Sequence, residues 1–549
     1  MNNNIPRILL ATNFVTIFAT VLSENGLNNT ISSNILYSSS PSPITGVDTD
    51  NLAGEVEFDI DHDDEVPDSD KFHSFDPMHS NSIPIALNSI GRRSKNFPEK
   101  LRERLRQRNL PINSNSTLSG YIVQYVDHFN KMDIRKWKQY FFYNLNYSKP
   151  ESGLNFLHIG GEGPISKAIV LEDSWMMMAW AKQYGAAAYS LEHRFYGQSL
   201  PTGLDHSVSQ LKYLSSRQAL ADIARFIKAV NRQRRIKDAK WIVFGGSYAG
   251  NLAAWLRQKH PNLVYGALSS SAPVRAVTDF PDYYLSISNL LQKSNLNSCL
   301  GDINEFFAKA KELLRSPQGR KSLGICPTRW EENTDMYHFF DDRLSEIAVQ
   351  VQGNCSDRNE LSGICSVYAG FAENNSTTFG GQGICVDSSY KLYVHSMRDP
   401  KPFWLRSWYW QMCTEFGFFQ TVGGNGAFGN ISLPLEYLAN SCADIFGSAY
   451  NKSRVELAVA RTNRIYGGAD QYNGTNVIFT HGSEDPWHAL AVHPSSNGSY
   501  MSIYIEGTSH CRDLYPPTPA DPASLRWARH VIDMELGKWI ADPNSSVIN

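Results

Sequence analysis

The sequence predicts an α/β fold in which a mostly parallel sheet is interrupted by a large helical insertion. Strand-like and helix-like segments alternate from about residue 120 to residue 275, which is typical of a parallel sheet with helices on both faces. From 276 to about 450 the sequence is mostly helical in character, and strand-like segments return at 476–486 and 500–510. An insertion at this point would lie over the carboxyl ends of the last strands, where such sheets bind ligands.

Each expected element has a local signal. The expected helix 215–233 is amphipathic and begins with a serine that can cap it. The helix 249–261 ends at a proline, and the closing helix, 523–540, starts just after Pro522. A further helix, 173–185, ends at a glycine. The expected strands of the first part lie within 138–147, 154–164, 186–199, 240–247 and 264–274.

Bulk composition excludes some classes of protein. The chain has 549 residues, 42% hydrophobic residues and a formal net charge of −3. This length suits two domains or one elaborated domain, and the net charge is not the strongly positive one that is typical of nucleic-acid-binding proteins.

We expect five segments along the chain: 1–23 (signal peptide), 24–118 (disordered tail or propeptide), 119–275 (first part of the sheet domain), 276–450 (cysteine-rich helical cap) and 451–549 (second part of the sheet domain).

The cysteines indicate an oxidising compartment. All eight follow residue 298, and no CxxC pair is present, so a metal site is not expected. An even number clustered in one region predicts disulfides, with the pairing left open. The expected disulfide cysteines are Cys299, Cys326, Cys355, Cys365, Cys385, Cys413, Cys442 and Cys511.

The N-terminus and the sequons also favour the secretory pathway. The run from Arg7 to Ser23 is apolar and too short for a typical membrane span, so we interpret it as a signal peptide. Thr12, Asn13 and Thr16 interrupt it and leave an uncleaved anchor open. N-x-S/T sequons predict glycosylation at Asn115, Asn146, Asn354, Asn430, Asn473 and Asn497, with further sequons at Asn374, Asn375 and Asn451.

The segment 24–118 has opposed charge blocks. It carries eleven acidic residues and no Lys or Arg from Asp48 to Asp70, and it turns basic from Arg92 to Arg108. Such blocks without apolar periodicity predict a solvated tail or propeptide. The sequence "GRRSK" at 91–95 is either a processing site or an accidental basic pair.

The sequence "GGSYAG" is close to a nucleophile elbow, which is written G-x-S-x-G. Ser247 follows the buried-strand pattern 240–246 and precedes a helix, the context that such an elbow requires. Gly245 lies two residues before it, but the residue two after it is Ala249 rather than glycine. Ser247 is therefore the candidate nucleophile, and Ala249 is a small departure from the motif.

A catalytic serine needs a base and an orienting acid. In an α/β-hydrolase fold these follow in the order Ser, Asp or Glu, His. The first strand after the insertion leads to Glu484 and Asp485, and the last leads to His510. Pro486 fixes the turn after Asp485, which favours that acid. The predicted triad is Ser247, Asp485 and His510, and no cofactor is expected.

The oxyanion hole is expected from two backbone regions. One donor is the N–H of Tyr248, the residue after the nucleophile. The other comes from the Gly-rich loop "GGEG", where Gly160 and Gly161 are the candidates.

Several motifs together resemble the S28 serine peptidases: "GGEGP", "LEHRFYGQSLP", "YLSSRQALADIARFI", "GGSYAGNLAAWLRQKHP", "SWYWQMCTEFGFFQT", "GSEDPWHAL" and "GTSHCRDLYP". The family includes lysosomal Pro-X carboxypeptidase, dipeptidyl peptidase II and thymus-specific serine protease, and "CTEFGFFQT" and "DPWHAL" are most similar to the last of these. The resemblance spans about 120 to 540. It implies an α/β-hydrolase fold with a large inserted helical cap, the same triad, and cleavage of peptides near a chain end, often after proline.

The resemblance leaves the substrate open. A substrate amine would need a carboxylate, and Glu162, Glu192 and Glu415 are candidates; Trp408 and Trp410 could pack a proline ring. The expected partner is a peptide, without nucleic acid or stable membrane insertion, and a homodimer is left open. Alternatives are an esterase or lipase on the same fold, or a non-catalytic binding protein. The expected location is extracellular or lysosomal.

Overall fold

The computed structural model describes most of the chain from residue 118 onward. The described residues are 56–58, 118–171, 175–293, 297–354, 365–369, 385–423, 428, 431–494 and 499–542. The expected signal peptide lies outside them, as does the expected tail 24–118, apart from 56–58 and the first residue of β2 at its end. Strand β1 (Val56–Phe58) pairs in parallel with β2 (Leu118–Tyr125), so a short strand from the expected tail adds to the edge of the sheet.

One large sheet organises the molecule. Its strand order is β1-β2-β3-β5-β4-β6-β7-β10-β11, and β3 runs antiparallel to both of its neighbours while the other neighbouring pairs are parallel. This is the expected α/β-hydrolase fold. The remaining strands are β3 (Lys136–Asn144), β4 (Leu154–Ile159), β5 (Ala187–Leu191), β6 (Lys240–Gly246), β7 (Gly266–Ser270), β10 (Val477–Gly482) and β11 (Met501–Ile505).

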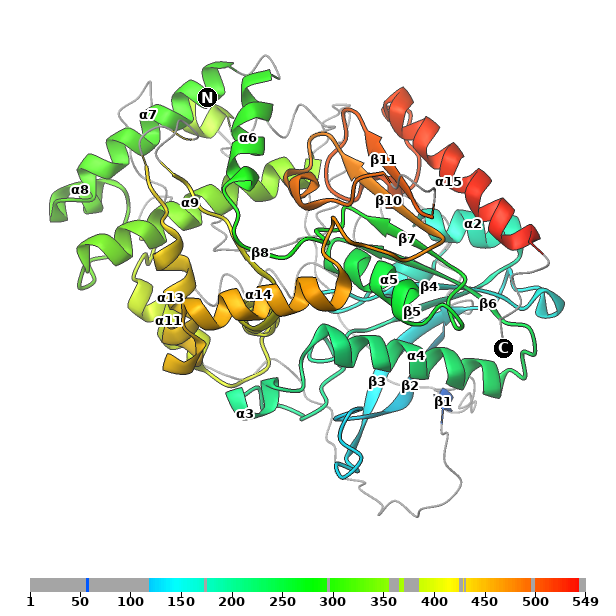
Figure 1. The fold of residues 1–549 in the computed structure, drawn as a ribbon. Helices are drawn as coiled ribbons and strands as arrows, with labels where there is room; N and C mark the ends of the chain where they lie inside the picture. The colour runs from blue at the N-terminus through cyan, green and yellow to red at the C-terminus, as the bar shows by residue number, and fades with distance from the viewer. Residues whose placement is uncertain are drawn as a thin grey trace, which may run out of the picture.

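The central strands β4, β5, β6, β7 and β10 are buried on both faces of the sheet, because successive residues along them are buried. In β6, Trp241 and Val243 pack into one core together with helices α4 and α5, whereas Ile242 and Phe244 pack into a second core with α2 and α15. Figure 1 shows α4 and α5 on one side of the strands and α15 on the other. The bounds are α2 (Met176–Tyr184), α3 (Val208–Leu211), α4 (Ser216–Gln233), α5 (Tyr248–Lys259) and α15 (Ala523–Ala541).

The predicted helix ends are confirmed by local geometry. The Ser215 side chain accepts a hydrogen bond from the backbone N–H of Gln218 and so caps α4. Helix α2 ends at Gly185, whose φ of 74° lies in the left-handed region. Short 3-10 turns complete this part: η1 (Pro150–Ser152), η2 (Lys167–Val170), η5 (Pro486–Leu490) and η6 (Arg512–Leu514).

A group of helices, the cap, is inserted between β7 and β10, within the segment 276–450 that was expected to be helical. Its helices gather at the opposite end of the molecule from α15 (Figure 1). It also contains a two-stranded sheet of β8 and β9. Its elements are β8 (Val277–Asp279), α6 (Asp282–Lys293), α7 (Asn297–Leu313), α8 (Pro317–Ser322), α9 (Glu332–Asn354), α11 (Tyr390–Arg398), α12 (Trp404–Gln411), the π-helical turn η3 (Met412–Phe416), β9 (Gly417–Phe419), α13 (Leu435–Phe446) and η4 (Ser448–Tyr450).

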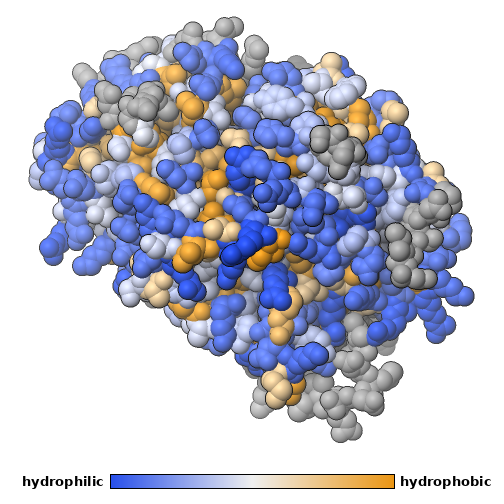
Figure 2. Space-filling model, in the orientation of Figure 1, coloured by the Kyte–Doolittle hydropathy of each residue, from blue (hydrophilic) through white to orange (hydrophobic). Residues whose placement is uncertain are grey.

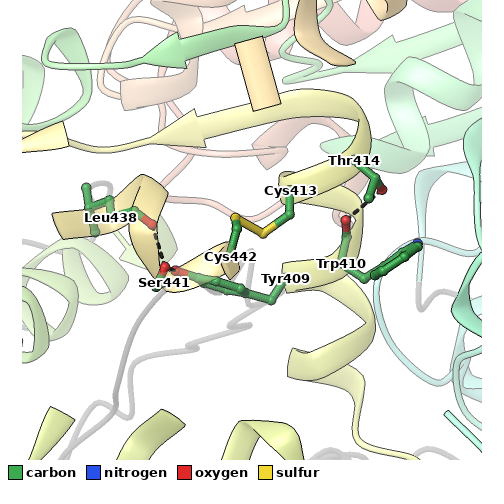
Figure 3. Close-up of a disulfide and its surroundings, with 7 residues drawn as sticks. All are labelled: Tyr409, Trp410, Cys413, Thr414, Leu438, Ser441 and Cys442. Atoms are coloured by element: carbon green, nitrogen blue, oxygen red, sulfur yellow. Dashed lines mark hydrogen bonds between the residues drawn. A yellow bond between two sulfur atoms is a disulfide. The ribbon is translucent and has the colours of Figure 1, made fainter. Parts of the chain in front are cut away.

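Three disulfides lie within the described part of the cap. They join Cys299 to Cys365, Cys326 to Cys385, and Cys413 to Cys442. The last bridge ties η3 to α13, and beside it the Tyr409 hydroxyl meets that of Ser441, which donates to the Leu438 carbonyl (Figure 3). Cross-links of this kind stabilise a fold chiefly by restricting its unfolded chain.

One cysteine departs from the predicted set, and a second is not described. Cys511 is free and buried, so the expected disulfide at this position is not formed. Its position just after β11 places it in the sheet domain, where its sulfur contacts the Ser270 carbonyl oxygen at 3.8 Å. Cys355 lies outside the described residues.

Helix α14 (Lys452–Tyr466) joins the cap to the sheet domain. Its Thr462 hydroxyl donates to the Glu415 carbonyl in η3, and its Tyr466 ring stacks on Trp255 of α5 at a centroid distance of 3.9 Å. The boundary expected at residue 450 therefore precedes a helix that belongs to both parts.

The outer surface is mixed in character. The face in Figure 2 is mostly hydrophilic, with apolar side chains in strips between hydrophilic ones. Across the described part of the chain, no helix combines the length and apolar character that crossing a membrane would require. Among the sequons, Asn146, Asn451 and Asn473 are exposed. The side chain of Asn354 is not described, and Asn115, Asn374, Asn375, Asn430 and Asn497 lie outside the described residues.

Candidate active site

Ser247 occupies a sharp turn between a strand and a helix. Strand β6 ends at Gly246 and α5 begins at Tyr248, which leaves Ser247 alone in the turn with φ 58° and ψ −130°. Residues with a side chain rarely adopt a positive φ, and such strain is concentrated at functional sites. The Ser247 N–H donates to the Ser270 carbonyl of β7 at 2.8 Å, which holds the turn against the sheet.

The glycines that this turn requires are Gly245 and Gly250. A Cβ at position 245 would lie 2.0 Å from the carbonyl oxygen of Ala249, and a Cβ at position 250 would lie 2.9 Å from the Ser270 carbonyl oxygen. Ala249 is buried. Its methyl carbon lies 3.5 Å from the point that a Cβ of Gly161 would occupy, an ordinary contact. The close contacts that require glycine are therefore at positions 245 and 250, and position 249 can hold the methyl group of alanine.

Asp485 and His510 meet at the carboxyl ends of adjacent strands. Asp485 follows β10 and His510 follows β11, which pair in parallel. His510 Nδ1 lies 2.9 Å from Asp485 Oδ2, and the other carboxylate oxygen accepts the backbone N–H of Trp487 at 3.0 Å. An ionised carboxylate only accepts hydrogen bonds, so Nδ1 carries the proton.

The loops that carry this pair are held together by the backbone. The Glu484 N–H donates to the Thr508 carbonyl at 3.0 Å, and the Gly507 N–H donates to the Ser483 hydroxyl at 2.8 Å. Gly482 permits this approach, because a Cβ there would lie 2.2 Å from the Thr508 carbonyl oxygen. The relative position of the acid and the imidazole is thus fixed by main-chain contacts.

Asp485 and His510 are both buried, and each of them shifts the pKa of the other. Burial opposes charge on each, but the neighbouring His510 lowers the pKa of Asp485 below its ordinary value, and Asp485 raises the pKa of His510 well above its own. His510 Nε2 is buried and has no hydrogen-bond partner among the described residues. This nitrogen is free to take a proton.

Two backbone N–H groups flank the elbow. Tyr248 is the first residue of α5, and the N–H groups of the first helical turn have no acceptor within the helix. Gly161 lies beside Ala249. The Gly160 N–H instead donates to the Leu191 carbonyl of β5 at 2.8 Å, so it is committed to the sheet and is not available as an oxyanion donor.

The side chain of Tyr248 links the elbow to the cap. Its hydroxyl lies 3.0 Å from His193 Nε2 and accepts the Gln411 amide at 2.8 Å. The Gln411 oxygen in turn accepts the Tyr196 hydroxyl at 2.7 Å. Trp408 of α12 also contacts the Tyr248 ring, at a centroid distance of 5.5 Å. Two residues of the cap therefore contact Tyr248, the residue after Ser247.

Comparison with known proteins agrees with this geometry. Residues 124–532 match the family described as "Serine carboxypeptidase S28". The chain belongs to peptidase family S28. It is a serine-type peptidase with an α/β-hydrolase fold.

Curated S28 relatives cover most of the chain. Human thymus-specific serine protease is 34% identical over 77% of this chain and 86% of its own length. A Caenorhabditis elegans protein whose name gives it a proposed serine protease activity is 35% identical over 78% of this chain and 89% of its own. Bovine lysosomal Pro-X carboxypeptidase is 27% identical over 77% and 88%, respectively.

In this S28 peptidase, two of the candidate carboxylates serve the fold. Glu192 accepts the Ser199 hydroxyl at 2.7 Å and the backbone N–H groups of Gln198 and Ile165 at 2.8 and 3.2 Å, and burial raises its pKa to about 7. Glu415 accepts the N–H and hydroxyl of Ser216 at 2.8 and 2.7 Å. These bonds use the oxygens that a substrate amine would need.

Of the remaining candidates, Trp410 belongs to the fold, whereas Glu162 and Trp408 lie near the elbow. Trp410 donates to the Leu214 carbonyl at 3.3 Å and packs against Phe446 and Tyr450, contacts that belong to the fold. Glu162 is buried close enough to Tyr196 to add to the effect of burial in raising that hydroxyl's pKa. Glu162 and Trp408 therefore remain near the elbow.

Of the two residues that hold Tyr248, sequence reasoning placed His193 at a strand end where it could line the pocket, and it missed Gln411. His193 has a visible signal, its position after a strand in "LEHRFYG", whereas Gln411 lies far away in the chain and has none. Within the described ranges, no group of three or more His, Cys, Asp or Glu side chains is arranged to hold a metal ion.

Proposed function

We propose that this S28 peptidase is an exopeptidase in which Ser247 is the nucleophile, His510 the base and Asp485 the orienting acid. The observation that carries the proposal is the 2.9 Å contact between His510 Nδ1 and Asp485 Oδ2 at the strand ends beside the Ser247 elbow. The contact fixes the imidazole tautomer that leaves Nε2 as the base.

The reaction follows from these roles. Ser247 Oγ forms a bond to the scissile carbonyl carbon while His510 Nε2 takes the hydroxyl proton. The oxyanion is stabilised by the N–H groups of Tyr248 and Gly161. The C–N bond then breaks, and His510 passes the proton to the leaving amine. Water attacks the acyl-enzyme in the same way, with His510 again as base, and releases Ser247.

A preference for chain ends is supported by the cap. Trp408 and Phe416 from the cap lie against Tyr248, at centroid distances of 5.5 and 5.2 Å. A cap this close to the nucleophile restricts the site to segments that can thread in, and a chain end threads more easily than a loop. The aromatic rings and the name of the Pro-X carboxypeptidase relative support a preference for proline.

The proposed location is the secretory pathway, with an extracellular or lysosomal end point. Three disulfides require an oxidising environment during folding. The expected glycosylation at Asn146 and Asn473 is compatible with their exposure. Expression in secretory cells should give a protein whose mobility increases on removal of N-glycans; an unglycosylated, fully reduced product would contradict this location.

Fluorophosphonate labelling tests the nucleophile. The wild type should be labelled and Ser247→Ala should not. His510→Ala should lose most activity, whereas His488→Ala, whose ring Nδ1 lies 2.5 Å from the Asp485 carbonyl oxygen, should retain it. Labelling of Ser247→Ala, or loss of activity in His488→Ala alone, would overturn the assignment.

Matched reporters test the exopeptidase type. A dipeptide anilide with proline next to the anilide should be cleaved with a free amine and resist cleavage when acetylated if the enzyme acts from the N-terminus. Peptides ending in Pro-X should lose X, and their C-terminal amides should not, if it acts from the C-terminus. Efficient cleavage inside blocked peptides would contradict both.

A further inference from the structure

A glutamine of the cap reaches the loop that carries the acid. Gln352 lies near the end of α9, and its Oε1 accepts the hydroxyl of Tyr283 at 2.7 Å and the indole N–H of Trp487 at 3.2 Å. The backbone N–H of Trp487 donates to Asp485 Oδ1 at 3.0 Å. Trp487 therefore connects Gln352 to the proposed acid, Asp485.

These contacts fix which way the amide faces. The indole nitrogen of Trp487 can only donate a hydrogen bond, so the glutamine oxygen must face it and the NH2 group must point elsewhere. Gln352 is 2% exposed, and its buried Nε2 has no hydrogen-bond partner among the described residues. Buried donors are nearly always paired, and an exception calls for an explanation.

The surroundings of the amide are aromatic. Trp487 contacts Phe280, Tyr283 and Phe418 at centroid distances of 5.6, 5.2 and 5.4 Å. Burial raises the pKa of Tyr283, and the charge on Asp485 adds to this, which places the Tyr283 hydroxyl within electrostatic reach of the acid. The amide of Gln352 is thus bonded to two members of an aromatic cluster at the border between the cap and the acid loop.

We propose that Gln352 is a substrate-binding residue whose Nε2 donates to a backbone carbonyl oxygen of the peptide, other than the scissile one. The scissile oxygen has its own donors at the elbow. A carbonyl is favoured over a carboxylate because the ionised Asp485 lies nearby and would repel a second negative charge. This inference rests on the proposed function and adds a specificity contact from the cap.

Two variants test the contact. Gln352→Met fills the same volume without polar atoms, and Gln352→Glu keeps acceptors for Tyr283 and Trp487 while removing the NH2 donor. Each should lower kcat/KM for a dipeptide anilide about tenfold, mainly through KM, as expected for loss of one hydrogen bond. Hydrolysis of p-nitrophenyl acetate, which has only the scissile carbonyl, and fluorophosphonate labelling should change less than about threefold.

A third variant separates binding from support of Trp487. Tyr283→Phe removes one bond to Oε1 but leaves Nε2 in place, so it should reduce the ratio of peptide to ester turnover less than either Gln352 variant. If both Gln352 variants keep the wild-type ratio, or if peptide and ester turnover fall together, the proposal is wrong. A wild type without Ser247-dependent labelling would instead contradict the proposed function.

Discussion

The sheet side and the cap side of the site are held by different forces. On the sheet side, loop backbones bond to one another, as between Glu484 and Thr508, and strand β10 beneath them is buried along its whole length. On the cap side, disulfides and aromatic contacts hold the helices, and the described cysteines that form bridges all lie in the cap. The difference teaches that the proposed catalytic residues and the proposed substrate-binding residues are stabilised by different interactions. A substitution on one side can therefore be expected to affect that side most.

Asp485→Asn should have the largest effect on the sheet side. The amide can no longer fix the Nδ1–H tautomer of His510, and a comparable change in other serine proteases lowers kcat about 10,000-fold. Peptide and ester turnover should fall together because both need the base. Steady-state kinetics of the two reporters would measure this; a loss confined to peptides would contradict the assigned role.

The same variant should move the pH profile. In the wild type, Asp485 raises the pKa of His510 well above its ordinary value despite burial, so kcat/KM should increase through a limb above about pH 6.5. In Asp485→Asn the residual activity should have its limb at lower pH, since burial still lowers the pKa of His510 while the raising effect of the Asp485 charge is lost. An unchanged limb would assign the titration to another group.

On the cap side, the double variant Cys413→Ser/Cys442→Ser should lower stability by about 2–4 kcal/mol. The bridge joins η3 to α13, and η3 is continuous with α12, which carries Trp408 and Gln411 to the elbow. Peptide turnover should therefore decline more than ester turnover. Denaturant titration with both reporters would show it; equal losses would mean that the cap and the sheet are one cooperative unit.

His481 should make the end of β10 sensitive to acid. Burial lowers its pKa to about 4, and neither ring nitrogen has a partner among the described residues. The unfolded chain binds this proton more readily, so the contribution to stability is present above about pH 6.5 and is lost as pH falls toward 4. His481→Asn should flatten this part of a Tm-against-pH curve; parallel curves for variant and wild type would refute it.

Ala249→Gly should have the smallest effect. It restores the usual elbow motif but removes a methyl that contacts the Gly161 loop and adds glycine to a helix, at a cost of about 0.5–1 kcal/mol. We expect kcat to change less than about threefold, since Gly245 and Gly250 already make the close contacts. A large gain in kcat would show that Ala249 restrains the turn.

Much of the fold could be predicted because its signals are local. Alternating strand and helix patterns, the Ser215 cap and the glycines around Ser247 each depend on neighbouring residues. Asp485 and His510 could be proposed because parallel strands bring their carboxyl ends together. The antiparallel β3 was not anticipated, because an apolar strand has the same sequence pattern in either direction.

The parts that sequence reasoning missed depend on distant partners. Gly160 stands in a Gly-rich loop, but its N–H is taken by Leu191. Glu192 and Glu415 resemble free carboxylates until their bonds to Ser199 and Ser216 are seen. Cys511 looked like a disulfide cysteine by number alone, although it lies in the sheet domain and is free.

The strand order also has a consequence for the timing of synthesis. The Ser247 strand leaves the ribosome early, the whole cap follows, and the strands that carry Asp485 and His510 come near the end. Because β10 lies between β7 and β11, the acid and the base cannot take their places until this late part of the chain is available. In the proposed mechanism, a growing chain therefore has its nucleophile but lacks its acid and base until synthesis is almost complete.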